Sequence, residues 1–385
     1  MNPLQKLLAL PQTEQEALGL VHTGAEIAQQ PATWKETRRI FFEQQAELKK
    51  FLQPTIDEEE NVFLVGAGSS DYIGGCLTHL LRTSWGVDVQ AVPSTDLLTN
   101  PEEFVLPKKR YLWISFSRSG DSPEGVAVLE EAIKGLPNVR HLVVSCNRNA
   151  KMVHIAGESP NCMAVVLAEA VNDRSLAMTS SFTNMVIFGQ CLANLWKDDN
   201  YDETLTRMCE AAEYLLDEGS ILAEQYAQQE FRNACFIGAG SLAAAARESA
   251  LKMTELTAGA TRAISETTLG LRHGPMSSLS ADTLFVMLMS QNERRRHYDA
   301  GLLAEIRHKD VVGALVAIGR LSQDADRSLY HPSFDGIPDE YAPAVYVLFG
   351  QLLGFFASLR GGLQPDSPSP AGIISRVVGQ FAIYN

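Results

Sequence analysis

The chain has 385 residues, of which 45% are hydrophobic and 20% are charged, with a formal net charge of −14. This composition is typical of a soluble globular protein with two domain cores. The negative charge argues against non-specific binding to nucleic acid or to an anionic membrane surface, so a bound anion must be held by local donors.

The N-terminal region precedes the first predicted domain and has no targeting signal. Its apolar patch is too short for a secretory signal, and Pro11 and Glu14 stand where a cleavage site would be needed. No membrane-spanning apolar run is visible further along the chain, so we expect a cytoplasmic protein. Residues 32–52 have the pattern of an amphipathic helix that supports the first domain.

A repeated segment indicates that one domain is used twice. The stretch NVFLVGAGSSDYIGGCLTHLL from Asn61 returns as NACFIGAGSLAAAARESALKM from Asn233, and the matching glycines Gly66 and Gly238 are 238 − 66 = 172 residues apart. Each copy has a β-rich run, then G-A-G-S, then a helical pattern. This order predicts two α/β domains, each with a doubly wound parallel sheet between helices.

Further elements follow in both copies. The first copy has predicted strands at 87–92, 110–117, 141–146 and 163–167 and predicted helices at 122–136 and 175–196. The second copy has predicted strands at 283–290 and 313–319 and a largely buried helix at 341–361. The polar stretch 197–203 marks the predicted boundary. We therefore divide the chain into an N-terminal helical segment (1–52), a first domain (53–200) and a second domain with a C-terminal tail (201–385).

The loop ISFSRSGDSPEG, residues 114–125, concentrates serines between a strand and a helix. Ser122 is the predicted N-cap and Pro123 the first helical residue. A helix N-terminus with clustered hydroxyls suits a phosphate monoester, although serines also serve simply to cap and turn. Ser69 and Ser70 of the first G-A-G-S turn are expected at the same edge of the sheet.

No cofactor or metal site is visible in the sequence. The turn after Gly66 lacks the third glycine of a dinucleotide fingerprint, and no P-loop is present. The eight histidines form no H-E-x-x-H pair, and the six cysteines have no C-x-x-C spacing, so we expect reduced core thiols. We expect neither a cofactor nor a metal.

These motifs together resemble the sugar isomerase (SIS) superfamily of phosphosugar-binding domains, arranged in tandem. The resemblance is carried by VGAGSSDYIGG, SFSRSGDSPEG and LAMTSSFT in the first domain and by ESALKMTELTAGATRAISETTLGLRHGP in the second. The stretches VPSTDLLTNP and LRHGPMSSL are most similar to the galactosamine-6-phosphate deaminase/isomerase group, often described as tagatose-6-phosphate ketose/aldose isomerases. The resemblance implies three-layer α/β/α domains and a phosphorylated amino-sugar substrate.

The resemblance also implies roles for individual residues. The positions that match phosphate and sugar contacts are Ser70, Ser117, Arg118, Ser119, Ser122, Thr179 and Ser180. Glu255 matches the carboxylate that moves the proton, Lys252 is its helix neighbour, and His273 matches the histidine that opens the sugar ring. In tandem relatives that histidine comes from the other subunit, which implies a homodimer.

Residue chemistry leaves simpler alternatives open. Glu248, Lys252 and Glu255 share one helix face at i, i+4 and i+7, and this spacing is also typical of a row of solvent-exposed salt bridges. His273 could likewise be a loop residue without a catalytic role. The second repeat has MSQNERRR where the first has its serine loop, which suggests one phosphate site per chain.

Three functions remain in view. The first is deamination of galactosamine 6-phosphate to tagatose 6-phosphate and ammonia, and the second is aldose–ketose isomerisation without deamination. The third is a phosphosugar sensor without turnover. Asn2 stands where an amidotransferase would carry its cysteine, and no lysine follows Lys309, both of which favour the degradative direction over synthesis from glutamine.

Overall fold

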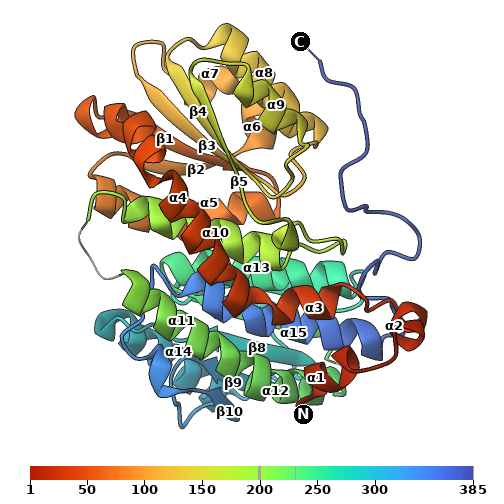
Figure 1. Cartoon of the computed structure of the whole chain (residues 1–385). Helices are drawn as coiled ribbons and strands as arrows, with labels where there is room; N and C mark the ends of the chain where they lie inside the picture. Colours follow the sequence, from red (N-terminus) through yellow and green to blue (C-terminus); the bar gives the residue numbers. More distant parts are fainter. Residues whose placement is uncertain (198–200, 230, 385) are drawn as a thin grey trace. The chain divides into compact units, whose positions relative to one another are not determined.

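The computed structural model describes residues 1–197, 201–229 and 231–384, and it contains two parallel sheets of five strands (Figure 1). The first sheet is built from β1 (Asn61–Gly66), β2 (Val89–Pro93), β3 (Tyr111–Ser117), β4 (Val139–Ser145) and β5 (Cys162–Val166). The second is built from β6 (Asn233–Gly238), β7 (Arg262–Thr267), β8 (Thr283–Leu288), β9 (Ala314–Ile318) and β10 (Arg327–Leu329).

Both sheets have the same topology. The first has the order β2-β1-β3-β4-β5, and the second, counted from its β7 edge, has the order β7-β6-β8-β9-β10. Each strand of the second sheet therefore has a counterpart in the first, and all pairings are parallel. This confirms the predicted α/β fold with a duplicated domain.

Helices cover both faces of the first sheet (Figure 1). One face packs against α5 (Ser69–Trp85), which in turn packs against α10 (Ser180–Ala193). On the other face, Phe63 and Trp113 form a core with Val128 of α8. The helices of this face and its connections are α6 (Ser94–Thr99), α7 (Pro101–Phe104), α8 (Pro123–Gly135) and α9 (Lys151–Gly157), with the short η1 (Glu169–Val171) after β5.

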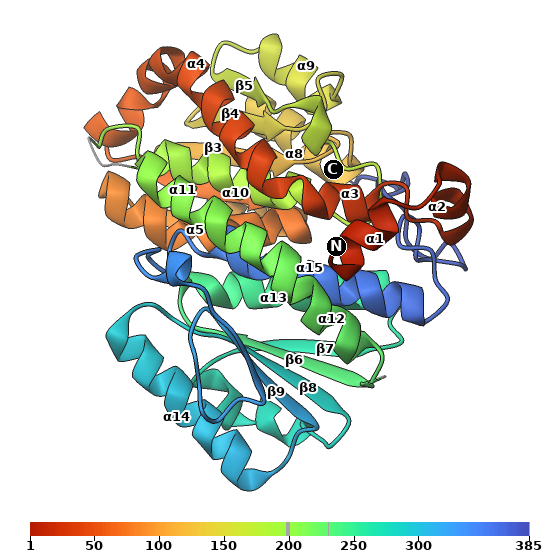
Figure 2. The ribbon, with the colours of Figure 1, turned by 60° about the horizontal axis from the view of Figure 1, so that its bottom comes forward.

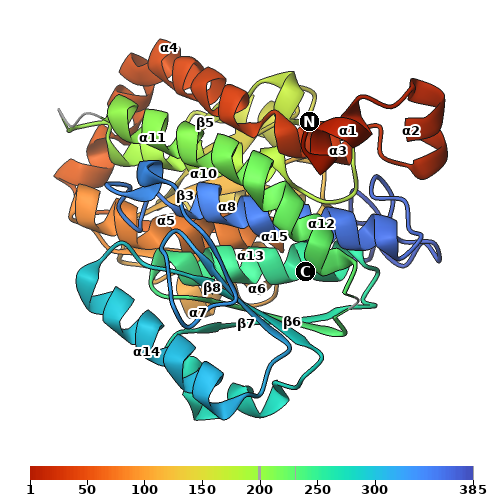
Figure 3. The same cartoon turned by 90° about the horizontal axis from the view of Figure 1, so that it is seen from below.

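The second sheet has an equivalent sandwich. Helix α13 (Ser241–Leu256) packs on one face and lies beside α15 (Pro343–Arg360), as Figures 2 and 3 show. Helix α14 (Glu293–Lys309) covers the other face, where Leu302, Leu303 and Ile306 pack on Phe285. The remaining elements here are α11 (Tyr201–Tyr214), η2 (Leu215–Gly219), α12 (Ser220–Ala227), η3 (Gly270–His273), η4 (Pro275–Ser278) and η5 (Pro332–Phe334).

By their contacts the residues form two compact units, each made of separate stretches. One unit takes 1–32, 174–179 and 202–373 and holds the second sheet, and the other takes 33–173, 180–201 and the segment from Ile374 onward and holds the first sheet. The predicted ranges 1–52, 53–200 and 201–385 are contiguous and stay a prediction. The predicted boundary at 197–203 includes residues 198–200, which lie outside the described residues.

The N-terminal segment is helical, as expected. It consists of α1 (Pro3–Leu8), α2 (Gln12–Leu18), α3 (Thr23–Ala28) and α4 (Gln30–Asp57). The predicted helix at 32–52 is the central part of α4, which reaches α10 through a bond from the Trp34 indole to Thr183 and one from the Thr37 hydroxyl to Asn184. These buried polar contacts fix α4 on the first-sheet unit.

One predicted helix needs correction, and two strands of the second sheet, β7 and β10, were not predicted. The helix predicted over 175–196 begins only at Ser180, because Asp173 accepts the Ser181 backbone N–H and so starts the helix there. Strand β7 was not predicted, since Arg262 and Glu266 break the apolar pattern, and the strand lies at a sheet edge where polar residues are tolerated.

Helix α15 is long and apolar enough to cross a membrane, although no such run was expected from the sequence. However, 83% of this helix is buried within the protein, as in the core helix of a soluble fold. None of the six cysteines, all of which lie in the described part of the chain, forms a disulfide bond. Burial raises the pKa of Cys235 to about 12, so this thiol stays protonated.

A buried histidine on β4 makes stability depend on pH. His141 is 1% exposed, and its ring packs edge-on against Trp113. Neither ring nitrogen has a hydrogen-bond partner among the residues that the structure describes. Burial lowers the pKa of His141 to about 4. In the unfolded chain this histidine is protonated below about pH 6.5, whereas in the folded chain it stays neutral down to about pH 4. The free energy of unfolding therefore decreases as the pH falls from about 6.5 toward 4.

We expect the free energy of unfolding to fall by about 2 kcal/mol through His141 between pH 8 and pH 5. Urea denaturation at both pH values should show this difference, and His141→Leu should remove it. The exposed His308 gives a matched control, because His308→Gln should keep the difference. An equal pH dependence in wild type and His141→Leu would contradict the prediction.

Candidate active site

The serine loop between β3 and α8 is held by its own hydroxyls. Ser117 Oγ accepts a hydrogen bond from the Gly120 backbone N–H (3.0 Å), and Ser119 Oγ accepts one from the Asp121 N–H (3.3 Å). Gly120 has a φ of 63°, and a Cβ there would lie 2.4 Å from Ala150, so the turn requires glycine. Because both serine oxygens accept from the backbone, their protons remain available to donate to an anion.

The neighbouring elements keep this loop in place. Asn147, just after β4, donates from its side-chain amide to the Ser119 carbonyl oxygen (2.9 Å), and the Lys151 N–H donates to the Asp121 carboxylate (2.9 Å). Ser122 is the N-cap of α8, as predicted, but its hydroxyl makes no capping hydrogen bond. The loop thus combines a helix N-terminus with hydroxyl donors, the arrangement that suits a phosphate.

The first G-A-G-S turn lies at the same sheet edge. Ser70 is buried in the first turn of α5, directly after β1, and a Cβ on Gly66 would lie 2.4 Å from the Ser70 backbone carbon. Strands β1 and β3 pair in parallel, with Val65 opposite Ser115, so both strands end together. The structure therefore brings Ser70 and the serine loop to one carboxyl edge of the first sheet.

Arg118 connects the loop to the C-terminal tail. Its buried guanidinium donates to the backbone oxygen of Arg376 (2.5 Å), and Arg376 donates in turn to the Asp173 carbonyl oxygen (2.7 Å) and to Asn172 Oδ1 (2.8 Å). The Asp173 carboxylate accepts the Ser180 hydroxyl (2.5 Å). The predicted ligand residue Ser180 is thus already engaged in a buried bond at the start of α10.

Sequence reasoning missed Arg376, Asn147 and Asp173. The tail contains no lysine, and Arg376 is its only basic residue after Arg360. A single arginine in a stretch without other basic residues could have indicated a specific contact. Asn147 and Asp173 lie in loops without a motif, and only the folded chain places them. Thr179 is fully buried and accepts a hydrogen bond from Gln351 through its backbone oxygen (3.4 Å).

Helix α13 carries a buried cluster of charges. Lys252 and Glu248 are fully buried, and the Glu255 side chain is 22% exposed. Lys252 Nζ lies 3.3 Å from Glu248 Oε1 and donates to Glu255 Oε2. Burial lowers the pKa of Lys252, but the two carboxylates outweigh it and hold this pKa above its ordinary value. The cluster is therefore not a solvated salt-bridge stripe.

The duplicated helix shows that the fold does not need these charges. Helices α5 and α13 start 241 − 69 = 172 residues apart, which is the repeat distance, so Glu248 and Lys252 correspond to Cys76 and Leu80. Both residues of α5 are buried and apolar. An uncharged pair thus fills the same place in the first domain, and the charges of α13 call for a functional explanation.

His273 lies apart from this cluster along the chain. It ends η3, is exposed, and precedes Gly274, whose φ is 125°. Among the residues that the structure describes, none of the hydrogen bonds joins His273 to Lys252 or Glu255. Within the same described part of the chain, no group of three or more His, Cys, Asp or Glu side chains could hold a metal ion.

Comparison with known proteins gives close relatives over almost the whole chain. No family model matches it. It is 37% identical over 372 residues to the "Putative D-galactosamine-6-phosphate deaminase AgaS" of Streptomyces coelicolor, covering 95% of this chain and 96% of the relative. It is 34% identical over 368 residues to the D-galactosamine-6-phosphate deaminase AgaS of Escherichia coli, covering 94% and 95%.

Solved structures agree with these relatives. The tagatose-6-phosphate ketose/aldose isomerase of Escherichia coli matches with a TM-score of 0.83 and 32% identity, covering 92% of this chain and 95% of that one. A structure from Clostridium novyi matches with a TM-score of 0.92 and 29% identity, covering 96% of both chains.

The buried cluster yields a stability prediction. Lys252→Met removes the cation between Glu248 and Glu255, and we expect the unfolding free energy at neutral pH to fall by about 3–5 kcal/mol, because a buried carboxylate loses its partner. Adding Glu248→Gln should recover most of this loss, since no buried charge then remains at that position. Urea denaturation measures both variants. A Lys252→Met protein as stable as wild type would contradict the prediction.

Proposed function

Because the chain belongs to the D-galactosamine-6-phosphate deaminase family, we propose that it converts D-galactosamine 6-phosphate and water to D-tagatose 6-phosphate and ammonia. The observation that carries the proposal is the buried lysine with two carboxylates on α13, where Glu248 and Lys252 stand at positions that are apolar in the duplicated helix. The names of the relatives give the substrate class.

We assign phosphate binding to the first domain. Ser70, Ser117, Ser119 and Ser122 supply hydroxyl donors at one sheet edge, next to the N-terminus of α8. Neutral donors suit this acidic chain, because they hold an anion without a cluster of cations. The phosphate takes no part in the chemistry, but its binding energy orients C1 and C2 of the sugar.

Glu255 is the proposed base for proton transfer between these carbons. On the open-chain aldehyde it removes the proton from C2, while the C1 oxygen gains a proton and an enolamine forms. Glu255 then returns its proton to C1, which leaves a ketimine at C2. Water adds to C2 of the protonated ketimine, the carbon–nitrogen bond breaks, and the proton taken up at the C1 oxygen is released. The products are ammonia and the ketose.

Lys252 and His273 have supporting roles in this proposal. The Lys252 ammonium holds Glu255 and stabilises negative charge on the sugar oxygen, a contribution that is typically about 100- to 1,000-fold in rate. His273 opens the sugar ring, and it is exposed, as needed for a residue supplied to a second subunit. We accordingly propose that the protein is a cytoplasmic homodimer and that its substrate is a small phosphorylated amino sugar.

Plain aldose–ketose isomerisation is the second candidate, because a solved relative carries that name. It uses the same proton transfer, but on a substrate with a hydroxyl at C2. Incubating the protein separately with galactosamine 6-phosphate, glucosamine 6-phosphate and tagatose 6-phosphate distinguishes the two. Ammonia from galactosamine 6-phosphate supports the deaminase, whereas isomerisation of tagatose 6-phosphate without any ammonia release supports the isomerase.

We expect Glu255→Gln to lower the rate of ammonia release by about 100- to 10,000-fold, because the amide cannot accept the C2 proton. Binding of sorbitol 6-phosphate, which has no carbonyl group to react, should be retained. Glu255→Asp keeps the charge beside Lys252 and should also be slow, which separates catalysis from folding.

Glu210→Gln is the matched control for this variant, since Glu210 is exposed on α11 and the substitution removes the same charge. It should leave the rate unchanged. Full activity of Glu255→Gln would overturn the proposed role, and sorbitol 6-phosphate binding without any turnover in wild type would favour a sensor.

Removing the loop hydroxyls should weaken substrate binding. Ser117→Ala and Ser119→Ala should each raise KM by about 10- to 100-fold, because each removes a hydrogen bond to a charged group. Ser159→Ala, in the same unit but at the end of α9, is the control and should leave KM unchanged. Steady-state kinetics with galactosamine 6-phosphate gives the answer, and unchanged KM values in both loop variants would contradict the assignment.

A further inference from the structure

The carboxyl edge of the second sheet has a cavity of its own. It has a volume of about 550 Å³ and lies where the G-A-G-S turn after β6, the segment after β7 and the first turn of α14 meet. Cavities of this size accommodate small ligands. In the repeat it corresponds to the serine-loop edge of the first sheet, since β8 and β3 are counterparts. It is formed within one unit and from residues without a role in the proposed reaction.

The charge of this cavity is positive. Its charged lining residues are Arg294 and Arg295, and no acidic residue lines it, although the chain as a whole carries −14. Arg294 is exposed, and among the described residues its side chain has no hydrogen-bond or ion-pair partner. Helix α14, which has 17 residues, also has its N-terminus in the wall of this cavity. An anion is the ligand that this combination favours.

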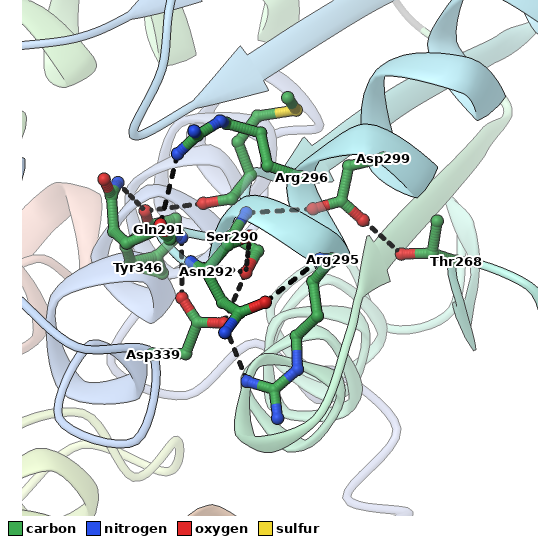
Figure 4. A network of polar contacts seen from close by, with 10 residues as sticks. Thr268, Ser290, Gln291, Asn292, Arg295, Arg296, Asp299, Asp339 and Tyr346 are labelled. Carbon is green, nitrogen blue, oxygen red and sulfur yellow. Dashed lines mark hydrogen bonds and ion pairs between the residues drawn. The ribbon is translucent and has the colours of Figure 1, made fainter.

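Arg295 is held in position for such a ligand (Figure 4). The buried Asp339 carboxylate pairs with its guanidinium at 2.9 Å and also accepts the Gln291 backbone N–H at 2.6 Å. A Cβ on Gly240 would lie 3.1 Å from Arg295 Cζ, so the guanidinium rests directly on the glycine turn. At the corresponding Gly68 of the first domain, nothing lies within 4 Å of such a Cβ.

This placement leaves a favourable position for negative charge. Gly240 is the N-cap of α13, so Arg295 brings a cation to a helix N-terminus, where the helix dipole disfavours it. A bound anion interacts favourably with the guanidinium and with the helix end at once. Asn292 stabilises the first turn of α14 in the cavity wall, because its side-chain oxygen accepts the Arg295 backbone N–H (3.1 Å). Its side-chain NH2 group can then donate to a ligand.

The cavity also has the features of a sugar site. The exposed Asn292 offers its side-chain amide, and the Tyr298 ring, 47% exposed, supplies a flat face at the rim. Thr268 is anchored by its bond to the buried Asp299 (2.6 Å), which in turn accepts the Ser290 N–H (2.9 Å). Through Asp299 of α14, these bonds connect the segment after β7 to the segment after β8 (Figure 4).

We propose that the second domain binds a phosphorylated sugar in this cavity, through Arg294, Arg295 and the N-terminus of α14. The two repeats thus hold the same class of ligand by different donors, hydroxyls in the first and guanidinium groups in the second. The expectation of one phosphate site per chain then applies to the catalytic site alone. This second site stands independently of the proposed reaction.

The test uses sorbitol 6-phosphate, which cannot react, and counts the equivalents bound per chain by titration calorimetry. Wild type should bind two equivalents. Ser117→Ala/Ser119→Ala should lose the first-domain equivalent and keep the other, and adding Arg294→Gln to that variant should weaken the remaining binding by about tenfold or more. Arg294 is exposed, so its replacement leaves the core intact.

Arg327→Gln is the matched control, because Arg327 is exposed on β10, outside the cavity, and loses the same charge. In the Ser117→Ala/Ser119→Ala background it should leave binding unchanged, and uncharged sorbitol should not bind. One equivalent in wild type that the serine substitutions remove, or equal binding by Arg294→Gln and Arg327→Gln, overturns the proposal. Ammonia release is measured separately, so failure here leaves the proposed function standing.

Discussion

The burial of Lys252 between two carboxylates is the constraint on which the candidate active site of the second domain depends. A buried ammonium is costly unless oxygens of opposite charge surround it, and α13 provides them at the two helical spacings that reach the same face. Glu248 is fully buried and completes the neutralisation, whereas Glu255 keeps part of its surface open. The helix thus separates a fully buried carboxylate from one that solvent can reach.

Duplication explains how one fold supports this division of labour. Both sheets have the same strand order, and each presents a glycine turn and a following loop at its carboxyl edge. The first copy has apolar residues on its helix and a loop rich in hydroxyl donors, and the second has charges on its helix and arginines in the first turn of α14. Each domain could therefore specialise without a change in its backbone topology.

Much of the fold could be predicted from the sequence because its signals are local. The G-A-G-S turns, the apolar strands and the Ser122–Pro123 helix start all depend on nearby residues, and the structure has them where the pattern indicated. The start of α10 could not be predicted, since it depends on a bond from Ser181 to Asp173 that needs the folded chain. Strand β7 likewise depends on its pairing with β6. Its polar end residues do not give the apolar pattern from which a strand is predicted.

The candidate site divides along the same line. Residue types and the helical spacing identified the serine loop and the lysine with its carboxylates. Arg376 was missed, although it is the only basic residue of the tail, because its contacts join residues far apart in the sequence. Arg118 binds the backbone oxygen of Arg376, not its side chain. A hydrogen bond to the main chain does not depend on the type of side chain, so Arg118 can hold the tail at this point whichever residue occupies position 376.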